Sequence, residues 1–191
     1  MKTVLATAAL LLVLLVVLLA VLAVVPAPAQ VRHLKEKKEE SSMTYRMVHP
    51  LHKIEATSKE VVYDLEADPG KKAFNKVSGW VDVTSFDSGN SNRDSHAMEV
   101  IDAIDFPDAR FEGTGFTQKG DSLFITGKVT FHGVTKDITA RAVSRWSQDK
   151  LEVDGSFDLS LAAFNIERPS LLMIPVEDTL SFEFVAMFGL E

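Results

Sequence analysis

Strict alternation of apolar and polar residues constrains this chain more than any other feature of its sequence. In the segment 151–161, every odd position is apolar or glycine and every even position is Glu, Asp or Ser. Successive side chains of a strand point to opposite faces, so this segment predicts a strand with one dry face and one wet face. The same pattern predicts further strands over 61–66, 77–83, 110–117, 123–131, 134–146 and 180–188.

Turn signals separate these strands at short intervals. They are Asp68-Pro69-Gly70, Lys119-Gly120-Asp121, His132-Gly133 and Gln148-Asp149-Lys150. Short connections favour antiparallel neighbours. Seven or eight such strands in one small domain predict an all-β fold, either a barrel or a sandwich.

One segment has helical rather than alternating spacing. Over 92–105, Asn92 can cap a helix, and Pro107 follows as a residue that cannot donate a backbone hydrogen bond. Four apolar residues then share one face of the helix, namely Ala97, Val100, Ile101 and Ile104. We expect this helix to lie across the mouth or the side of a barrel, with that face inward.

The first 29 residues predict export. Met-Lys-Thr precedes an apolar run over 4–25, and Ala27-Pro28-Ala29 then supplies a small-x-small cleavage site. The run is also long enough to span a bilayer, and basic residues follow it, so a retained N-terminal anchor is the alternative. Either outcome places the domain outside the cytoplasm, in the periplasm or cell envelope, unless the positive-inside bias inverts the anchored form.

The rest of the chain divides into a charged segment and one domain. Residues 30–43 are polar and charged and are interpreted as a solvated linker, and 44–191 as the folded domain. The chain has no cysteine, which excludes disulfides and thiolate metal sites. Its net charge of −7 argues against nucleic acid as a partner.

No residue cluster is typical of a metal site or of a catalytic site. His49 and His52 are three residues apart, but Pro50 lies between them and the segment is extended. That spacing does not direct two ligands at one metal as an i, i+4 pair on a helix would. The chain also lacks a Gly-x-Ser-x-Gly motif. We therefore predict no catalytic residues, no metal and no cofactor.

The cluster Arg93-Asp94-x-His96 is the best candidate for a polar site, and two interpretations stay open. In the first, Asp94 supports the helix N-terminus, Arg93 anchors the preceding loop and His96 packs at the helix base. In the second, Arg93 and His96 contact the polar head of a ligand at the cavity rim, since arginine suits phosphate.

The inward set of the strands could fill a core or line a hollow. Its members are Val81, Val83, Phe111, Ile125, Val129, Phe131, Ile138, Phe157, Leu159, Phe182 and Phe184, together with Ala140 and Val153. About eight strands leave an interior that is either just filled or able to hold one small ligand. Inward glycines at 79, 113, 127 and 155 remove side-chain volume and favour a cavity.

Four segments together resemble one protein family. They are Trp80 to Asn90, Arg93-Asp94-x-His96 followed by Phe106-Pro107, Gly127-x-Val-Thr-Phe-His-Gly-Val-Thr-Lys136, and Phe164-Asn165-Ile166-Glu167-Arg168-Pro169. In this order and spacing they resemble the YceI-like family of small exported proteins, over most of the chain after about Tyr45. The resemblance implies a lipocalin-like barrel of eight antiparallel strands that binds polyisoprenoid or related amphiphilic lipids without a cofactor. It also implies roles in lipid carriage, storage and stress protection.

Three features depart from the family pattern. The region before Gly79 looks short, Ala97 stands where a larger apolar residue is common, and an apolar turn over 171–175 follows Arg168-Pro169. That turn is either a mobile gate or a hydrophobic plug.

Together these observations favour a non-enzymatic barrel that binds a long-chain lipid. We expect the partner to be an isoprenoid or other long-chain lipid, which requires a hollow barrel. In the anchored alternative, residues 4–25 would also associate with the membrane. The oligomeric state stays open, a homodimer being one option. Two rivals remain: a structural or interaction barrel with a filled core, and a hydrolase or isomerase that uses Arg93, Asp94 and His96.

Overall fold

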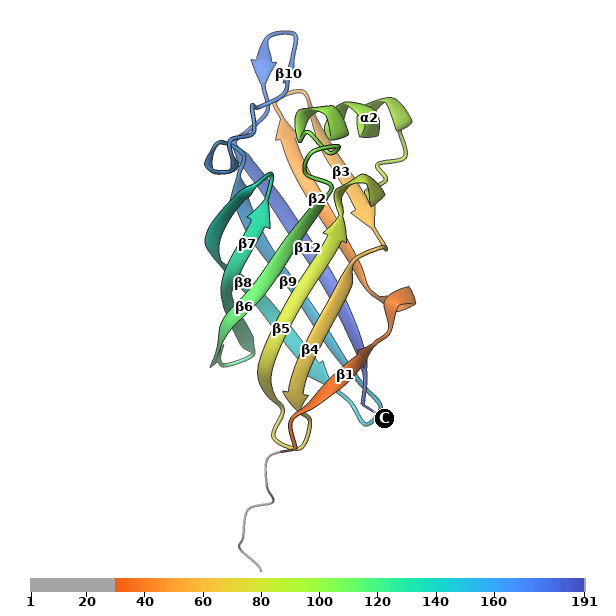
Figure 1. The fold of residues 1–191 in the computed structure, drawn as a ribbon, viewed down its shortest axis with the longest axis vertical. Coiled ribbons are helices and arrows are strands. Elements are labelled where there is room, and N and C mark those ends of the chain that lie inside the picture. Colours follow the sequence, from red (N-terminus) through yellow and green to blue (C-terminus); the bar gives the residue numbers. More distant parts are fainter. Residues whose placement is uncertain (1–29, 191) are drawn as a thin grey trace, which may run out of the picture.

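The computed structural model describes residues 30–190, which form a β-barrel with a helix at one end (Figure 1). The predicted signal segment, 1–29, lies outside the described residues. The strands are β1 (Arg32–Glu36), β2 (Ser42–His49), β3 (His52–Ser58), β4 (Val62–Asp68), β5 (Ala73–Asp82), β6 (Asp108–Lys119), β7 (Ser122–Phe131), β8 (Val134–Trp146), β9 (Lys150–Ser160), β10 (Ser170–Leu171), β11 (Ile174–Pro175) and β12 (Thr179–Gly189). The helical elements are α2 (Ser91–Val100) and the 3-10 turns η1 (Lys38–Glu40), η2 (Val83–Ser85) and η3 (Ala162–Phe164).

Eight strands close into a ring, which confirms the predicted all-β antiparallel barrel. Their order is β1-β4-β5-β6-β7-β8-β9-β12, and β12 pairs with β1 again. The alternation seen in the sequence explains the closure. In β7, for example, Ile125 and Val129 are buried while Lys128 and Thr130 are exposed. Each strand therefore places one face inside the tube, and no strand of the ring keeps a free edge along its whole length.

The hairpin β2–β3 widens the wall near the helix. Along one edge, β12 pairs with β1 at Gly189↔Lys35 and with β2 at Phe182↔Tyr45, and η1 connects the two partners. An isolated bridge between Thr57 and Asp87 then joins β3 to the loop that precedes α2. The hairpin therefore adds two strands to the wall at the end that α2 covers.

The expected linker over 30–43 is wrong for most of its length. Residues 32–36 are strand β1, which pairs with both β4 and β12, and β2 begins at Ser42. In β1 only Leu34 is buried, so its charged neighbours hid the strand pattern. The region before Gly79 is accordingly not short of strands, because β1, β2, β3 and β4 all precede it.

Helix α2 is shorter than the predicted 92–105. Asn90 rather than Asn92 caps it, since the Asn90 side chain accepts a hydrogen bond from the Arg93 N–H at 3.1 Å. A left-handed Asp102 (φ 47°) ends it, with Ala103 N–H donating to Met98 O and Asp102 N–H to Glu99 O. This paired arrangement is a Schellman motif.

The early stop explains one wrong core assignment. Ile104 lies beyond the helix and is 97% exposed, so it does not share an inward face with Ala97, Val100 and Ile101. Those three residues do line the interior cavity described below. The helical spacing therefore predicts the inward face correctly for Ala97, Val100 and Ile101, but not for Ile104, which follows the helix.

Candidate functional site

An apolar cavity of about 590 Å³ occupies the barrel interior. Every apolar strand residue predicted to face the interior lines it, namely Val81, Val83, Phe111, Ile125, Val129, Phe131, Ile138, Ala140, Val153, Phe157, Leu159, Phe182 and Phe184. These residues belong to two buried clusters, one around Leu65 and Phe188 and one around Phe131 and Leu180. The cavity therefore runs along the side chains of both clusters.

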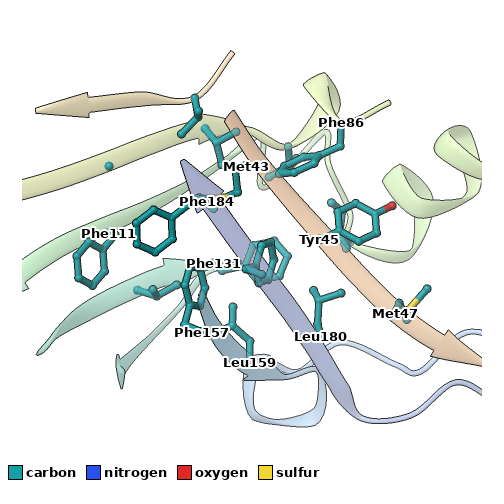
Figure 2. Close-up of a pocket in the computed structure, with 18 of the residues that line it drawn as sticks. Met43, Tyr45, Met47, Phe86, Phe111, Phe131, Phe157, Leu159, Leu180 and Phe184 are labelled. Carbon is teal, nitrogen blue, oxygen red and sulfur yellow. The ribbon is translucent and has the colours of Figure 1, made fainter. Parts of the chain in front are cut away.

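Aromatic rings make one continuous strip along the cavity wall (Figure 2). Phe157 stacks on Phe182 with ring centroids 4.9 Å apart and an interplanar angle of 10°. Phe184 lies 6.4 Å from Phe157, and Tyr45 lies 6.4 Å from Phe182. The strip offers flat apolar surface from the deep part of the barrel to the region below α2.

The inward glycines act differently from the prediction, because neighbouring side chains fill the space that three of them leave. A Cβ at Gly127 would lie 2.4 Å from the ring of Phe111, and one at Gly155 would lie 2.4 Å from the ring of Phe184. At Gly113 it would lie 2.5 Å from Val77. The missing side chains therefore let these groups lie close against the wall, and they enlarge the cavity only indirectly.

The two ends of the cavity differ. Phe74 packs on Phe116 and Trp146 with ring centroids 5.5 Å apart in both pairs, next to the turns that close the end opposite α2. At the other end the cavity reaches exposed residues of α2, such as His96, and of the β10–β11 hairpin, such as Leu171. We define this second end as the mouth.

Arg93, Asp94 and His96 all lie along the cavity at the mouth, where Arg93 and Asp94 bond to Ser88 and His96 Nδ1 lies 3.7 Å from the Glu99 carboxylate. Arg93 donates from Nε to Ser88 Oγ at 2.8 Å and from Nη2 to Ser88 O at 2.7 Å. The Asp94 carboxylate accepts from the Ser88 N–H at 3.2 Å. Both residues thus anchor the loop before α2. His96 does not pack at the helix base, because 63% of its side chain is exposed.

Sequence reasoning missed the contribution of β2 to the site. Met43, Tyr45 and Met47 line the cavity at every second position, an alternation that begins inside the presumed linker and was therefore overlooked. The Tyr45 ring packs 5.2 Å from Phe86. Burial raises the pKa of the Tyr45 phenol, and the nearby Asp94 carboxylate raises it further. Tyr45 therefore stays neutral and places a hydroxyl beside the Arg93–Asp94 pair.

Two histidines connect segments at the mouth. His49 accepts the Leu51 N–H at Nδ1 (3.2 Å), which leaves Nε2 to donate to the Ile174 carbonyl at 3.0 Å. His132 lies 2.9 Å from Phe164 O through Nδ1 and 3.3 Å from the Asp102 carboxylate through Nε2. Among residues 30–190 no group of three or more His, Asp or Glu side chains is placed to hold a metal ion.

The comparisons with known proteins decide the family. Residues 34–188 match the YceI-like domain. The chain belongs to the YceI-like family. This confirms the resemblance found in the sequence.

Curated relatives of this YceI-like chain come from several bacteria. A UPF0312 protein of Vibrio parahaemolyticus is 37% identical over 112 residues, which are 54% of this chain and 59% of that protein. The chain thus spans about three fifths of the length of that relative. A UPF0312 protein of Pseudomonas putida is 27% identical over 76% of this chain and 77% of its own length.

Solved structures show the same fold. The crystal structure of Burkholderia cenocepacia BcnA superposes with a TM-score of 0.73 at 21% identity, over 80% of this chain and 99% of that chain. A polyisoprenoid binding domain from Saccharophagus degradans, implicated in plant cell wall breakdown, gives a TM-score of 0.62 at 11% identity, over 84% of this chain and 99% of its own. At these identities the likeness concerns the fold alone.

Helices contribute no membrane span to this part of the chain. Within residues 30–190, none of them has the length and apolar character needed to cross a bilayer.

Proposed function

We propose that this YceI-like barrel binds one long-chain isoprenoid or similar amphiphilic lipid, without catalysing a reaction, in the periplasm or cell envelope. The observation that carries the proposal is the apolar cavity of about 590 Å³, which reaches exposed residues at the mouth. Its volume lies within the roughly 300–1,000 Å³ typical of small-molecule sites. The polyisoprenoid binding domain of Saccharophagus degradans, which has the same fold, supports the choice of ligand.

The residues that line the cavity favour an apolar ligand. Each ~100 Å² of apolar guest surface removed from water contributes ~2.5 kcal/mol, so a hydrocarbon chain binds well with few polar contacts. The aromatic strip presents flat faces against which the planar double bonds of an isoprenoid chain can lie. A polar head would stay at the mouth, near the Tyr45 hydroxyl, Arg93 and the exposed His96.

Lipid extraction and native mass spectrometry of the purified protein test the proposal. We expect a bound species whose mass matches an extracted isoprenoid lipid, at about one per barrel. A matched pair of variants localises it, since Ile138 lines the cavity while the adjacent Thr139 is exposed on the outer face. Ile138→Glu should remove the bound lipid, because burying an unpaired carboxylate beside the chain is costly, and Thr139→Glu should retain it. Equal lipid content in both folded variants would contradict binding in the cavity.

A further inference from the structure

The β10–β11 hairpin presents apolar side chains to solvent at the mouth of the barrel. Leu171, Leu172, Met173 and Ile174 are 47%, 76%, 95% and 40% exposed. Figure 1 shows this hairpin projecting beyond the barrel at the end that carries α2. Four consecutive exposed apolar residues on a protruding tip are unusual for a surface that meets only water.

The turn of this hairpin holds its apolar residues in an unfavourable backbone conformation. Leu172 and Met173 both have positive φ, at 54° and 63°. Such a two-residue turn normally carries Asn-Gly, because in the left-handed region the Cβ of most residues lies too close to the following carbonyl oxygen. The hairpin itself contributes only two residue pairs and belongs to no larger sheet. Neither folding stability nor turn chemistry explains why Leu and Met occupy these positions.

Hydrogen bonds connect the β10–β11 hairpin to a second turn that carries an exposed apolar residue. Leu51, in the turn between β2 and β3, is 62% exposed. His49 joins the two turns, since its ring accepts the Leu51 N–H and donates to the Ile174 carbonyl. The Glu177 N–H also donates to Val48 O at 2.8 Å. We call the exposed apolar residues of the two turns, Leu51 and Leu171–Ile174, the apolar tip.

The apolar tip is continuous with the cavity. Pro169, Ser170 and Leu171 belong both to the base of the hairpin and to the cavity lining. A hydrocarbon chain that left the cavity past Leu171 would therefore remain against apolar side chains as far as Met173.

The two turns of the apolar tip carry basic residues. Within the segments 48–54 and 168–176 the charged residues are Lys53 and Arg168, both exposed. The exposed Glu55, Glu167 and Glu177 lie directly outside these segments. Basic residues next to apolar ones favour the interface of a membrane with anionic lipids. The opposite side of the mouth, around α2, carries Glu99, Asp102 and Asp105 and should stay in water.

We propose that the apolar tip inserts into the surface of an anionic lipid bilayer and aligns the mouth with it. The narrow, convex shape favours a bilayer over a protein partner, because a stable protein interface buries roughly 800 Å² on each side with matched shape. A bilayer instead accepts protruding side chains without a complementary shape. The proposal concerns docking and stands whether or not the cavity holds the lipid proposed above.

Site-specific fluorescence tests the docking directly. The chain has no cysteine, so Leu51→Cys carries a single environment-sensitive label within the apolar tip. Gln148→Cys is the matched control, because it is exposed in the β8–β9 turn, beside Asp149, whose carbonyl binds the Leu190 N–H at the far end of the barrel. The barrel closes within residues 32–189, and solved chains of this fold align with it over up to 99% of their length, so the chain starting at Gln30 is used.

Vesicles of phosphatidylcholine with phosphatidylglycerol should shift the emission of the label at position 51 to shorter wavelength and leave the label at 148 unchanged. In the background Leu172→Asn with Met173→Gly, the vesicle affinity should fall by about tenfold or more, because two inserted side chains are lost while the turn is preserved. Identical responses at 51 and 148, or an unchanged affinity in that background, would overturn the proposal. A shift at 51 that needs no vesicles and grows with protein concentration would assign the tip to a second copy of the chain instead. Lipid extraction from the same samples reports separately on cavity binding.

Discussion

The ring of Phe111 on β6 occupies the space into which a side chain at Gly127 on β7 would project. An added Cβ would lie 2.4 Å from two atoms of that ring and 2.5 Å from the Glu112 carbonyl oxygen. Gly127→Ala should therefore lower the free energy of unfolding by ~1–3 kcal/mol through overpacking. Gly79→Ala is the matched control, since its nearest neighbour would be 3.6 Å away, and it should change stability little. Urea unfolding of both variants measures the difference, and equal effects would show that the close approach does not restrict position 127.

Phe157 should be decisive for lipid retention, because it contacts both Phe182 and Phe184 in the aromatic strip. Phe157→Asp places a charge in the middle of the apolar cavity, and we expect the folded variant to lose bound lipid completely. Ser156→Asp adds the same charge to the outer face of the same strand and should keep it. Mass spectrometry of extracted lipid provides the measurement. Wild-type lipid content in Phe157→Asp would contradict the cavity as the binding site.

Arg93 should affect lipid binding mainly by holding the loop before α2 in place. Two of its guanidinium nitrogens already donate to Ser88, so Arg93→Ala frees the segment before α2. We expect faster amide hydrogen exchange over residues 86–94 and a similar loss of affinity for a polyprenol and for its phosphate. If affinity fell for the phosphate alone, Arg93 would instead be a contact for the polar head, as the second interpretation of the sequence held.

Glu36 should make the barrel less stable as the pH rises. Burial raises the pKa of its carboxyl above the ordinary 4.5, and hydrogen bonds from Tyr63 and Ser41 only partly offset this. The folded state thus holds the proton more tightly than the unfolded chain. The contribution is complete below pH 4.5 and is lost as the pH rises through the pKa of the folded state.

The variant Glu36→Gln checks this sign. It should be more stable than the wild type at neutral pH, and the advantage should shrink as the pH is lowered toward 4.5. Glu39→Gln is the control, because Glu39 is exposed in η1. Thermal unfolding across this pH range measures the difference, and an advantage that grew on acidification would reverse the assignment.

The apolar hairpin turn should be replaceable without loss of stability. Leu172→Asn with Met173→Gly puts the preferred residues at two positions of positive φ, and we expect a gain of about 1 kcal/mol or more in the free energy of unfolding. Calorimetry measures it. A clear loss of stability would mean that Leu172 and Met173 support the fold itself.

The sequence predicted the barrel wherever burial follows strict alternation. In β7 and β9 each inward position is apolar or glycine, and the apolar strand residues predicted to face the interior line the cavity. Strand β1 escaped prediction because Leu34 alone is buried among charged residues, and its place in the sheet depends on pairing with β4 and β12. Such long-range pairing leaves no local signal.

The sequence predicted which strand residues line the cavity, but not the end of α2 or the role of the glycines. The end of α2 depends on the left-handed Asp102, which helical spacing cannot reveal, so Ile104 was assigned to the wrong side. The role of the glycines was misjudged because the sequence does not show which ring would pack against them. For β2, by contrast, the sequence does contain a signal. The alternation of Met43, Tyr45 and Met47 predicts a strand with these three residues on one face.

The place where the described chain starts has a consequence for how the barrel could be held. Arg32 donates to the Leu190 carbonyl at 2.6 Å, so both termini of the described chain meet at the closed end, opposite the apolar tip. A group attached at Gln30 would therefore be held at the far end of the barrel and would leave the mouth accessible.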